Sequence, residues 1–199
     1  MKKVIIITGA GAGIGKACAE YFLKKNYKVA LLGRNRNKLI IDSKNDDSMS
    51  IVCDISQYSD VKNAFQKINK KWGRIDTLFN NAGIGKPSNT IDLISPDDWL
   101  DVVNTNLNGN FYCAKEAFFY MKNQKPQGGR IINNGSISAH VPRPGSAPYT
   151  STKHAITGLT RSISLDGRKF NIACSQIDIG NAGTEMTKRM SEGIIQASG

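Results

Sequence analysis

The sequence lacks the features that would place a chain in a membrane or outside the cell. No apolar run approaches the ~20 residues of a membrane-spanning helix, and the short apolar run near the start ends at Thr8 without a signal-peptide cleavage site. No CxxC pair occurs, and the two histidines are not spaced with the cysteines as zinc ligands are. We therefore expect a cytoplasmic protein without a membrane segment, disulfide or metal site. The four cysteines are Cys18, Cys53, Cys113 and Cys174.

The sequence also lacks any concentrated block of charge. Its net charge is +11, yet its 27 lysines and arginines are scattered, with no run of five and no basic stretch interleaved with aromatics. Such a surface attracts anionic ligands in general, whereas a nucleic-acid groove needs basic residues gathered on one face. We expect no nucleic-acid partner, and an RNA-binding module is the weakest of the alternatives that we consider.

Neither a linker nor an internal repeat interrupts the 199 residues, so we expect a single domain over 1–199. Short apolar runs alternate with amphipathic stretches, which predicts βαβ units in an α/β fold, a doubly wound parallel sheet of the Rossmann type. The expected strands are 3–8, 28–33, 49–53, 74–80, 129–134 and 170–177; the main helices are 14–25, one capped by Ser56 that reaches Trp72, one from Ser95 to about Met121, and 148–165.

Residues 8–15, the glycine loop, carry the first functional signal. They read TGAGAGIG, follow the apolar run 4–7 and precede a helical pattern that starts near Lys16. Glycine has no Cβ, so such a loop turns sharply and lets a ligand approach the backbone. The helix that follows directs its first N–H groups and its positive dipole end at the loop. Glycines also gather in plain turns, but between a strand and a helix they favour a dinucleotide site.

The residues after the second and third strands bear on the kind of dinucleotide. About 20 residues past the glycine loop, where an acid would bind the 2′-hydroxyl of NAD, the chain has Gly33 and Arg34, with Arg36 close by. A guanidinium suits a 2′-phosphate, so we expect NADP(H) rather than NAD(H). The alternative is that Arg34 is an ordinary charged loop residue. Asp54 either accepts a hydrogen bond from the adenine amine or caps the next helix.

Three residues around and after the fifth strand indicate proton chemistry. Ser136 follows the strand, and Tyr149 and Lys153 stand four residues apart on one face of a predicted helix. A tyrosine titrates near pKa ~10, and a nearby cation lowers that pKa so that the phenol exchanges a proton near neutral pH. A lone Tyr-x-x-x-Lys is common on surface helices, so the pattern gains its meaning from the glycine loop in the same chain.

With these motifs in view, the sequence resembles the short-chain dehydrogenase/reductase family. It has the family's Thr-Gly-x-x-x-Gly-x-Gly at 8–15, Asn-Asn-Ala-Gly at 80–83, Asn106 in the long helix, Ser136, and Tyr-x-x-x-Lys at 149–153. The motifs occur in the family's order over nearly the whole chain. The resemblance implies an enzyme that interconverts a small carbonyl substrate and its alcohol by hydride transfer with NADP(H).

The resemblance also implies a role for each catalytic residue. Tyr149 would be the general acid in reduction and the base in oxidation, and Lys153 would lower its pKa and hydrogen-bond the nicotinamide ribose. Ser136 would polarise or orient the carbonyl. Asn106 would hold a water that relays protons to Lys153.

The expected cofactor-binding residues follow from the same resemblance. After the sixth strand the family usually has Pro-Gly and then a threonine near the carboxamide; here Ile179 replaces the proline, while Gly180 and Thr184 remain. The full set is Thr8, Gly9, Gly13, Ile14, Gly15, Arg34, Asp54, Asn81, Ala82, Gly83, Tyr149, Lys153 and Thr184.

The end of the chain is a departure from the family. Members usually continue for several tens of residues with more of the substrate lid, a seventh strand and a subunit contact. We therefore expect either a natural short form or a C-terminally truncated piece, in a sheet that lacks its last strand. A bare sixth strand is an exposed edge that favours association, so a homo-oligomer stays open. The alternative to an active enzyme is a catalytically idle NADP-binding protein on the same fold.

Overall fold

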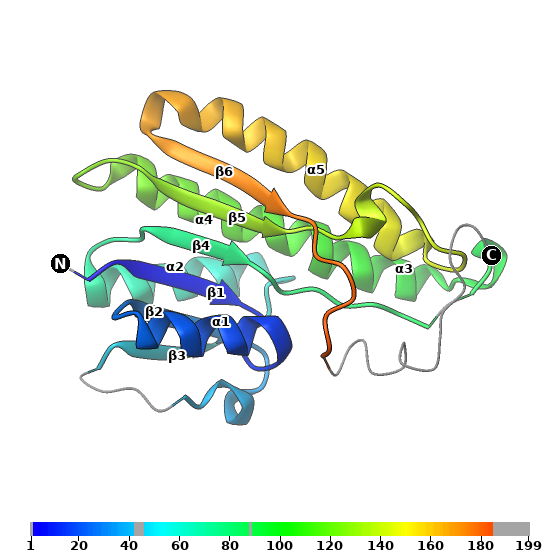
Figure 1. The fold of residues 1–199 in the computed structure, drawn as a ribbon, viewed down its shortest axis with the longest axis horizontal. Helices are drawn as coiled ribbons and strands as arrows, with labels where there is room; N and C mark the ends of the chain where they lie inside the picture. Colours follow the sequence, from blue (N-terminus) through cyan, green and yellow to red (C-terminus); the bar gives the residue numbers. More distant parts are fainter. Residues whose placement is uncertain (1, 42–45, 88, 185–199) are drawn as a thin grey trace.

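The computed structural model describes residues 2–41, 46–87 and 89–184. Its sheet is parallel throughout, in the order β3-β2-β1-β4-β5-β6 (Figure 1). The order reverses between β1 and β4, and in open α/β sheets ligands bind at such a point, beyond the carboxyl ends of the strands. The predicted Rossmann-type fold is confirmed. The strands are β1 (Val4–Thr8), β2 (Lys28–Gly33), β3 (Ser48–Val52), β4 (Thr77–Asn80), β5 (Gly129–Asn134) and β6 (Ile172–Ile177).

Helices cover both faces of the sheet, as the continuous burial of β1 requires. Ile5 and Ile7 face one core cluster, which α1 (Gly13–Lys24) covers, whereas Val4 and Ile6 face the cluster beneath α2 (Tyr58–Trp72) and α4 (Asn110–Asn123) (Figure 1). No helix in the described ranges is both long and apolar enough to cross a bilayer. The remaining helical elements are α3 (Pro96–Val103), α5 (Ala147–Gly167), η1 (Arg36–Leu39), η2 (Ile91–Leu93), η3 (Asn104–Gly109), η4 (Ile137–Ala139) and η5 (Arg168–Phe170).

Helix α2 begins one residue later than expected. The predicted cap at Ser56 is wrong, because Gln57 occupies the N-cap position and α2 starts at Tyr58 without a side-chain cap. Ser56 instead bonds to the residue two positions before it, since its hydroxyl and its backbone N–H both donate to Oδ1 of Asp54, at 2.8 and 3.0 Å. Asp54 therefore closes a local turn after β3 and does not cap α2.

The predicted long helix from Ser95 is confirmed at its start and interrupted in its middle. The Ser95 side chain accepts a hydrogen bond from Asp98 N at 3.0 Å, as an N-cap does. Between α3 and α4, however, η3 is a π-helical segment. There Asn110 Nδ2 donates to the Asn106 carbonyl oxygen at 2.6 Å. An asparagine side chain thus provides a hydrogen bond to a backbone oxygen where the regular α-helical pattern is interrupted.

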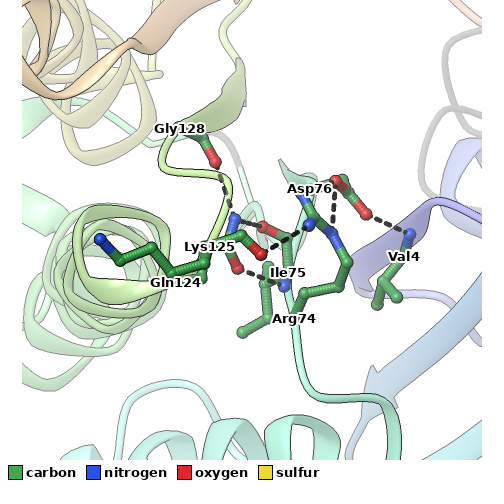
Figure 2. Close-up of polar contacts among 7 residues, drawn as sticks. All are labelled: Val4, Arg74, Ile75, Asp76, Gln124, Lys125 and Gly128. Atoms are coloured by element: carbon green, nitrogen blue, oxygen red, sulfur yellow. Dashed lines mark hydrogen bonds and ion pairs between the residues drawn. The ribbon is translucent and has the colours of Figure 1, made fainter. Parts of the chain in front are cut away.

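Strand β4 starts at Thr77 rather than Arg74, and the Gln124 side chain occupies the backbone groups of Ile75 just before it (Figure 2). Gln124, just after α4, accepts from Ile75 N through Oε1 and donates to Ile75 O through Nε2, both at 2.9 Å. Asp76 accepts from Val4 N at 2.8 Å and forms an ion pair with Arg74. This polar cluster lies at the amino ends of β1 and β4, opposite the end where ligands bind.

Candidate active site

The glycine loop has the close backbone packing that its sequence predicts. Gly9 and Gly13 have φ of +64° and +50°, values that favour glycine. A Cβ on Gly15 would lie 2.3 Å from the Gly9 carbonyl oxygen, so only glycine lets the first turn of α1 rest against the loop. Backbone N–H groups at such a helix start form a cradle for a diphosphate. The loop geometry therefore fits a dinucleotide.

Thr8 and Asn81 hold this loop to the end of β4. The Thr8 hydroxyl accepts hydrogen bonds from Asn81 N at 3.0 Å and Ala82 N at 2.9 Å, and Asn81 Nδ2 donates back to Thr8 O at 2.9 Å. Thr8 is completely buried. Its side chain therefore fixes the loop from beneath, and Ala82 lies so near Gly9 that a Cβ there would come within 2.9 Å of its Cα.

Ser136 and Tyr149 meet at the carboxyl end of β5. Ser136 caps η4, accepting from Ser138 N at 3.1 Å, so its own proton is free to point elsewhere. Burial raises the pKa of Tyr149, while a hydrogen bond with the Ser136 side chain and the charge of Arg143 act to lower it. The net direction is upward, which contradicts the expected lowering of the Tyr149 pKa. Desolvation of the phenolate outweighs the Ser136 hydrogen bond and the charge of Arg143.

Lys153 lies one helical turn beyond Tyr149, with 3% of its surface exposed. Its Nζ donates to Asn134 O at 2.6 Å and lies 5.4 Å from the centre of the Tyr149 ring. Burial lowers the pKa of Lys153 to about 8, although the negative charge of Asp178 opposes this. The ammonium is thus held in a dry place and loses its proton much more readily than an ordinary lysine.

Asn106 is buried close to Lys153, and Gly83 keeps the space between them open. The Asn106 side chain accepts from Ile84 N at 2.8 Å and donates to Ile84 O at 2.9 Å. A Cβ on Gly83 would lie 3.3 Å from Asn106 Oδ1 and 3.9 Å from Lys153 Nζ. The π-helical turn carries Asn106 inward, so that one side chain fixes the strand-end loop beside the lysine.

A cavity of about 460 Å³ joins the glycine loop to Ser136 and Tyr149. Thr184 borders it beside Gly13, where a Cβ would lie 3.1 Å from Thr184 Cγ2. Several expected residues do not line it: Thr8, Gly15, Asn106 and Lys153 support it from behind, and Arg34 is exposed at the end of β2. The expected residues that do line it are Gly9, Gly13, Ile14, Asn81, Ala82, Gly83, Ser136, Tyr149 and Thr184.

Three residues outside the predicted set of site residues shape the site. Asn134 receives Lys153 Nζ, and its Nδ2 donates to Asn81 Oδ1 at 3.0 Å. Arg143 lines the cavity and acts on Tyr149. Asp178 accepts from Ser136 N at 3.0 Å. The available signal was position: Asn134 and Asp178 are polar residues at the carboxyl ends of adjacent strands, where parallel sheets gather their site residues.

The chemistry of the site is that of an anion cradle joined to a proton-transfer group. The described ranges contain no group of three or more His, Cys, Asp or Glu side chains that could hold a metal ion. They do contain a glycine-rich backbone cradle and, across the cavity, a hydroxyl and a phenol with a buried ammonium behind them. These residues fit a dinucleotide whose reactive end lies beside Tyr149.

The chain is similar to known proteins over most of its length. The short chain dehydrogenase family model matches residues 3–194. The chain is 33% identical over 198 residues to a 3beta-hydroxysteroid dehydrogenase of Mediterraneibacter gnavus, covering 97% of this chain and 71% of that protein. A 3-ketoacyl-(acyl-carrier-protein) reductase from Brucella melitensis, complexed with NADH, superposes with a TM-score of 0.88 at 29% identity, over 92% of this chain and 78% of that one. ElxO with NADP bound superposes with a TM-score of 0.87 at 33% identity, over 97% and 79%. The chain therefore belongs to the short-chain dehydrogenase family of oxidoreductases.

Proposed function

We propose that this protein is an NADP(H)-dependent oxidoreductase that interconverts a carbonyl and an alcohol. The observation that carries the proposal is the cavity in which the glycine cradle faces Ser136 and Tyr149, with Lys153 buried behind them. When bound, the nicotinamide supplies or accepts the hydride. The protein's own residues bind and orient the reactants and move the proton.

Tyr149 is the proton donor in the reducing direction. Its raised pKa keeps the phenol protonated at neutral pH, which is the form a general acid needs. The substrate oxygen receives this proton from Tyr149 Oη. Ser136 Oγ already accepts the Ser138 amide, so its hydroxyl proton is available to the same oxygen and orients the carbonyl.

Lys153 and Asn106 resupply the proton. The pKa of Lys153, lowered to about 8 by burial, allows the ammonium to release and regain a proton near neutral pH. Asn106 holds a water that connects Lys153 with the surroundings, in the space that Gly83 leaves open. Lys153, which donates to Asn134 O at 2.6 Å, would also hydrogen-bond the nicotinamide ribose.

Arg34 selects the phosphorylated cofactor. It is exposed at the end of β2, beyond the glycine loop, with Arg36 nearby and no acid at the expected ribose contact. A guanidinium there binds a 2′-phosphate with charge-assisted hydrogen bonds. Asp54 keeps a carboxylate oxygen for the adenine amine while its Oδ1 holds Ser56. Thr184, beside Gly13, is the proposed contact to the carboxamide.

The test is Tyr149→Phe, measured against wild type with NADPH and a panel of small carbonyl compounds. We expect NADPH binding within twofold or so of wild type and a loss of turnover on the order of 10²- to 10⁴-fold, since only the proton donor is removed. Phe119→Tyr, at an exposed position of α4, is a control for aromatic exchange elsewhere. Equal turnover in Tyr149→Phe contradicts the mechanism, and NADPH binding by a wild type that reduces no carbonyl favours an idle cofactor-binding protein.

A further inference from the structure

Asp178 follows β6 and reaches across to the chain after β5. Its Oδ1 accepts from Ser136 N at 3.0 Å and from Gln176 Nε2 at 2.6 Å, while its Oδ2 lies 2.8 Å from His140 Nε2. The carboxylate therefore contacts both ends of the segment that carries Ser136 and η4. One side chain just after β6 thus fixes the backbone from which the proposed carbonyl-orienting hydroxyl projects.

The backbone is shaped to receive this carboxylate. Gly135 N donates to Ile177 O at 2.9 Å and Ile137 N to Ile179 O at 3.4 Å, which continues the β5–β6 pairing beyond both strands. A Cβ on Gly135 would lie 2.1 Å from Asp178 Oδ1. A side chain at position 135 would therefore displace the carboxylate from Ser136.

The groups that donate hydrogen bonds to Asp178 explain why its carboxyl stays ionised. Burial alone would raise its pKa, but hydrogen bonds from His140, Gln176 and the Ser136 backbone lower it more, so the net direction is downward. Its negative charge acts on Lys153, where it opposes the effect of burial. Asp178 thus acts on Ser136 through a backbone hydrogen bond and on Lys153 through its charge.

We propose that Asp178 is a positioning residue, whose carboxylate holds the Ser136 backbone in register so that the hydroxyl faces Tyr149. The proposal rests on the proposed function for its catalytic consequence. It does not require Asp178 to touch substrate or cofactor. Its contribution is geometric, because a misplacement of about 1 Å near reacting atoms can cost on the order of 10²-fold in rate.

The experiment compares Asp178→Ala, Asp178→Asn and Gly135→Ala with wild type, and uses Asp166→Ala, an exposed acid near the far end of α5, as the matched control. Asparagine keeps an oxygen that can accept from Ser136 N, whereas alanine keeps none. We expect Asp178→Ala and Gly135→Ala to lose on the order of 10- to 100-fold in kcat with little change in KM for NADPH. Asp178→Asn should restore most of kcat at neutral pH.

A second readout does not depend on activity. Hydrogen exchange of the Ser136 amide should accelerate tenfold or so in Asp178→Ala, because that amide loses its acceptor, and should stay slow in Asp178→Asn and Asp166→Ala. If Asp178→Ala does not fold, Asp178→Ser takes its place, since serine is too short to reach Ser136 N. Unchanged exchange and unchanged kcat in the alanine or serine variant overturn the proposal.

The variants also separate position from charge. In Asp178→Asn the charge that opposes burial is gone, so activity that depends on protonated Lys153 should decline at a lower pH than in wild type. If Asp178→Asn loses as much kcat as Asp178→Ala while the Ser136 amide stays protected, the residue acts by charge and the positioning role is wrong. A wild type without any turnover overturns the proposed function alone, because the amide exchange still decides the role of Asp178.

Discussion

Lys153 donates from Nζ to the carbonyl oxygen of Asn134 at 2.6 Å. Asn134 in turn donates from its side chain to Asn81, and Asn81 donates to the backbone of Thr8. A continuous line of hydrogen bonds therefore runs from the buried ammonium on α5 across the carboxyl ends of β5, β4 and β1 to the glycine loop. The proposed cofactor cradle and Lys153 are therefore parts of one hydrogen-bond network.

The buried charge of Lys153 should make stability depend on pH. The folded pKa of about 8 lies below the ordinary value of 10.5, so the folded state binds fewer protons between these values and stability rises with pH there. Below pH 8 both states are charged and the burial cost is fully present. We expect Lys153→Met to stabilise the protein more at pH 7 than at pH 10, by about 2 to 3 kcal/mol. Denaturant unfolding at both pH values measures the free energy of unfolding, with the exposed Lys62→Met as control. If Lys153→Met changes stability equally at both pH values, the prediction is wrong.

Two Gly→Ala substitutions should have different effects, one raising stability and the other weakening NADPH binding. A Cβ on Gly15 would lie 2.3 Å from Gly9 O, whereas nothing lies within 4 Å of a Cβ on Gly158, inside α5. We expect Gly158→Ala to stabilise by roughly 0.5–1 kcal/mol through helix propensity. Gly15→Ala should weaken NADPH binding at least tenfold or so, because the cradle must distort. Thermal unfolding and NADPH titration of both variants decide this, and equal affinity in Gly15→Ala would show that the loop geometry does not bind the cofactor.

The Gln124 side chain should contribute to stability without touching the active site. It makes hydrogen bonds to Ile75 N, Ile75 O and Gly128 O, the last at 2.8 Å (Figure 2). Truncation leaves these backbone groups without that partner, so Gln124→Ala should cost about 2 kcal/mol. Denaturant midpoints measure the loss, and Gln66→Ala, on the exposed side of α2, should have almost none. A reduction in turnover at temperatures where the variant stays folded would contradict the separation from the site.

Arg34→Asp should reverse the cofactor preference. Loss of the guanidinium removes a charge-assisted contact and the new carboxylate repels a 2′-phosphate while it suits a 2′-hydroxyl. We expect KM for NADPH to rise on the order of 10- to 100-fold and KM for NADH to fall. Arg168→Asp, in η5 at the opposite end of the sheet, makes the same charge change as a control. A wild type that prefers NADH would show the assignment of NADP(H) to be wrong.

Local sequence patterns predict helices and strands well where one apolar face or one capping residue determines the element. The Ser95-Pro96 start, the six strands and the order of motifs are visible because apolar periodicity and glycine geometry act over a few residues. Boundaries fail where distant partners compete for the backbone. Ile75 bonds to Gln124, and Ser56 bonds to Asp54, so β4 and α2 both begin later than expected.

The sequence by itself determined the family and the fold, and it supplied the proposed catalytic side chains, because each motif places the required residue types at a strand end or on one helix face. Only the tertiary structure decided their electrostatics. Tyr149 shares a helix face with Lys153, as predicted, yet its pKa moves upward because packing removes water from the phenol. The role of Asp178 was equally hidden, since its contact with Ser136 spans 42 residues and exists only when β5 and β6 pair.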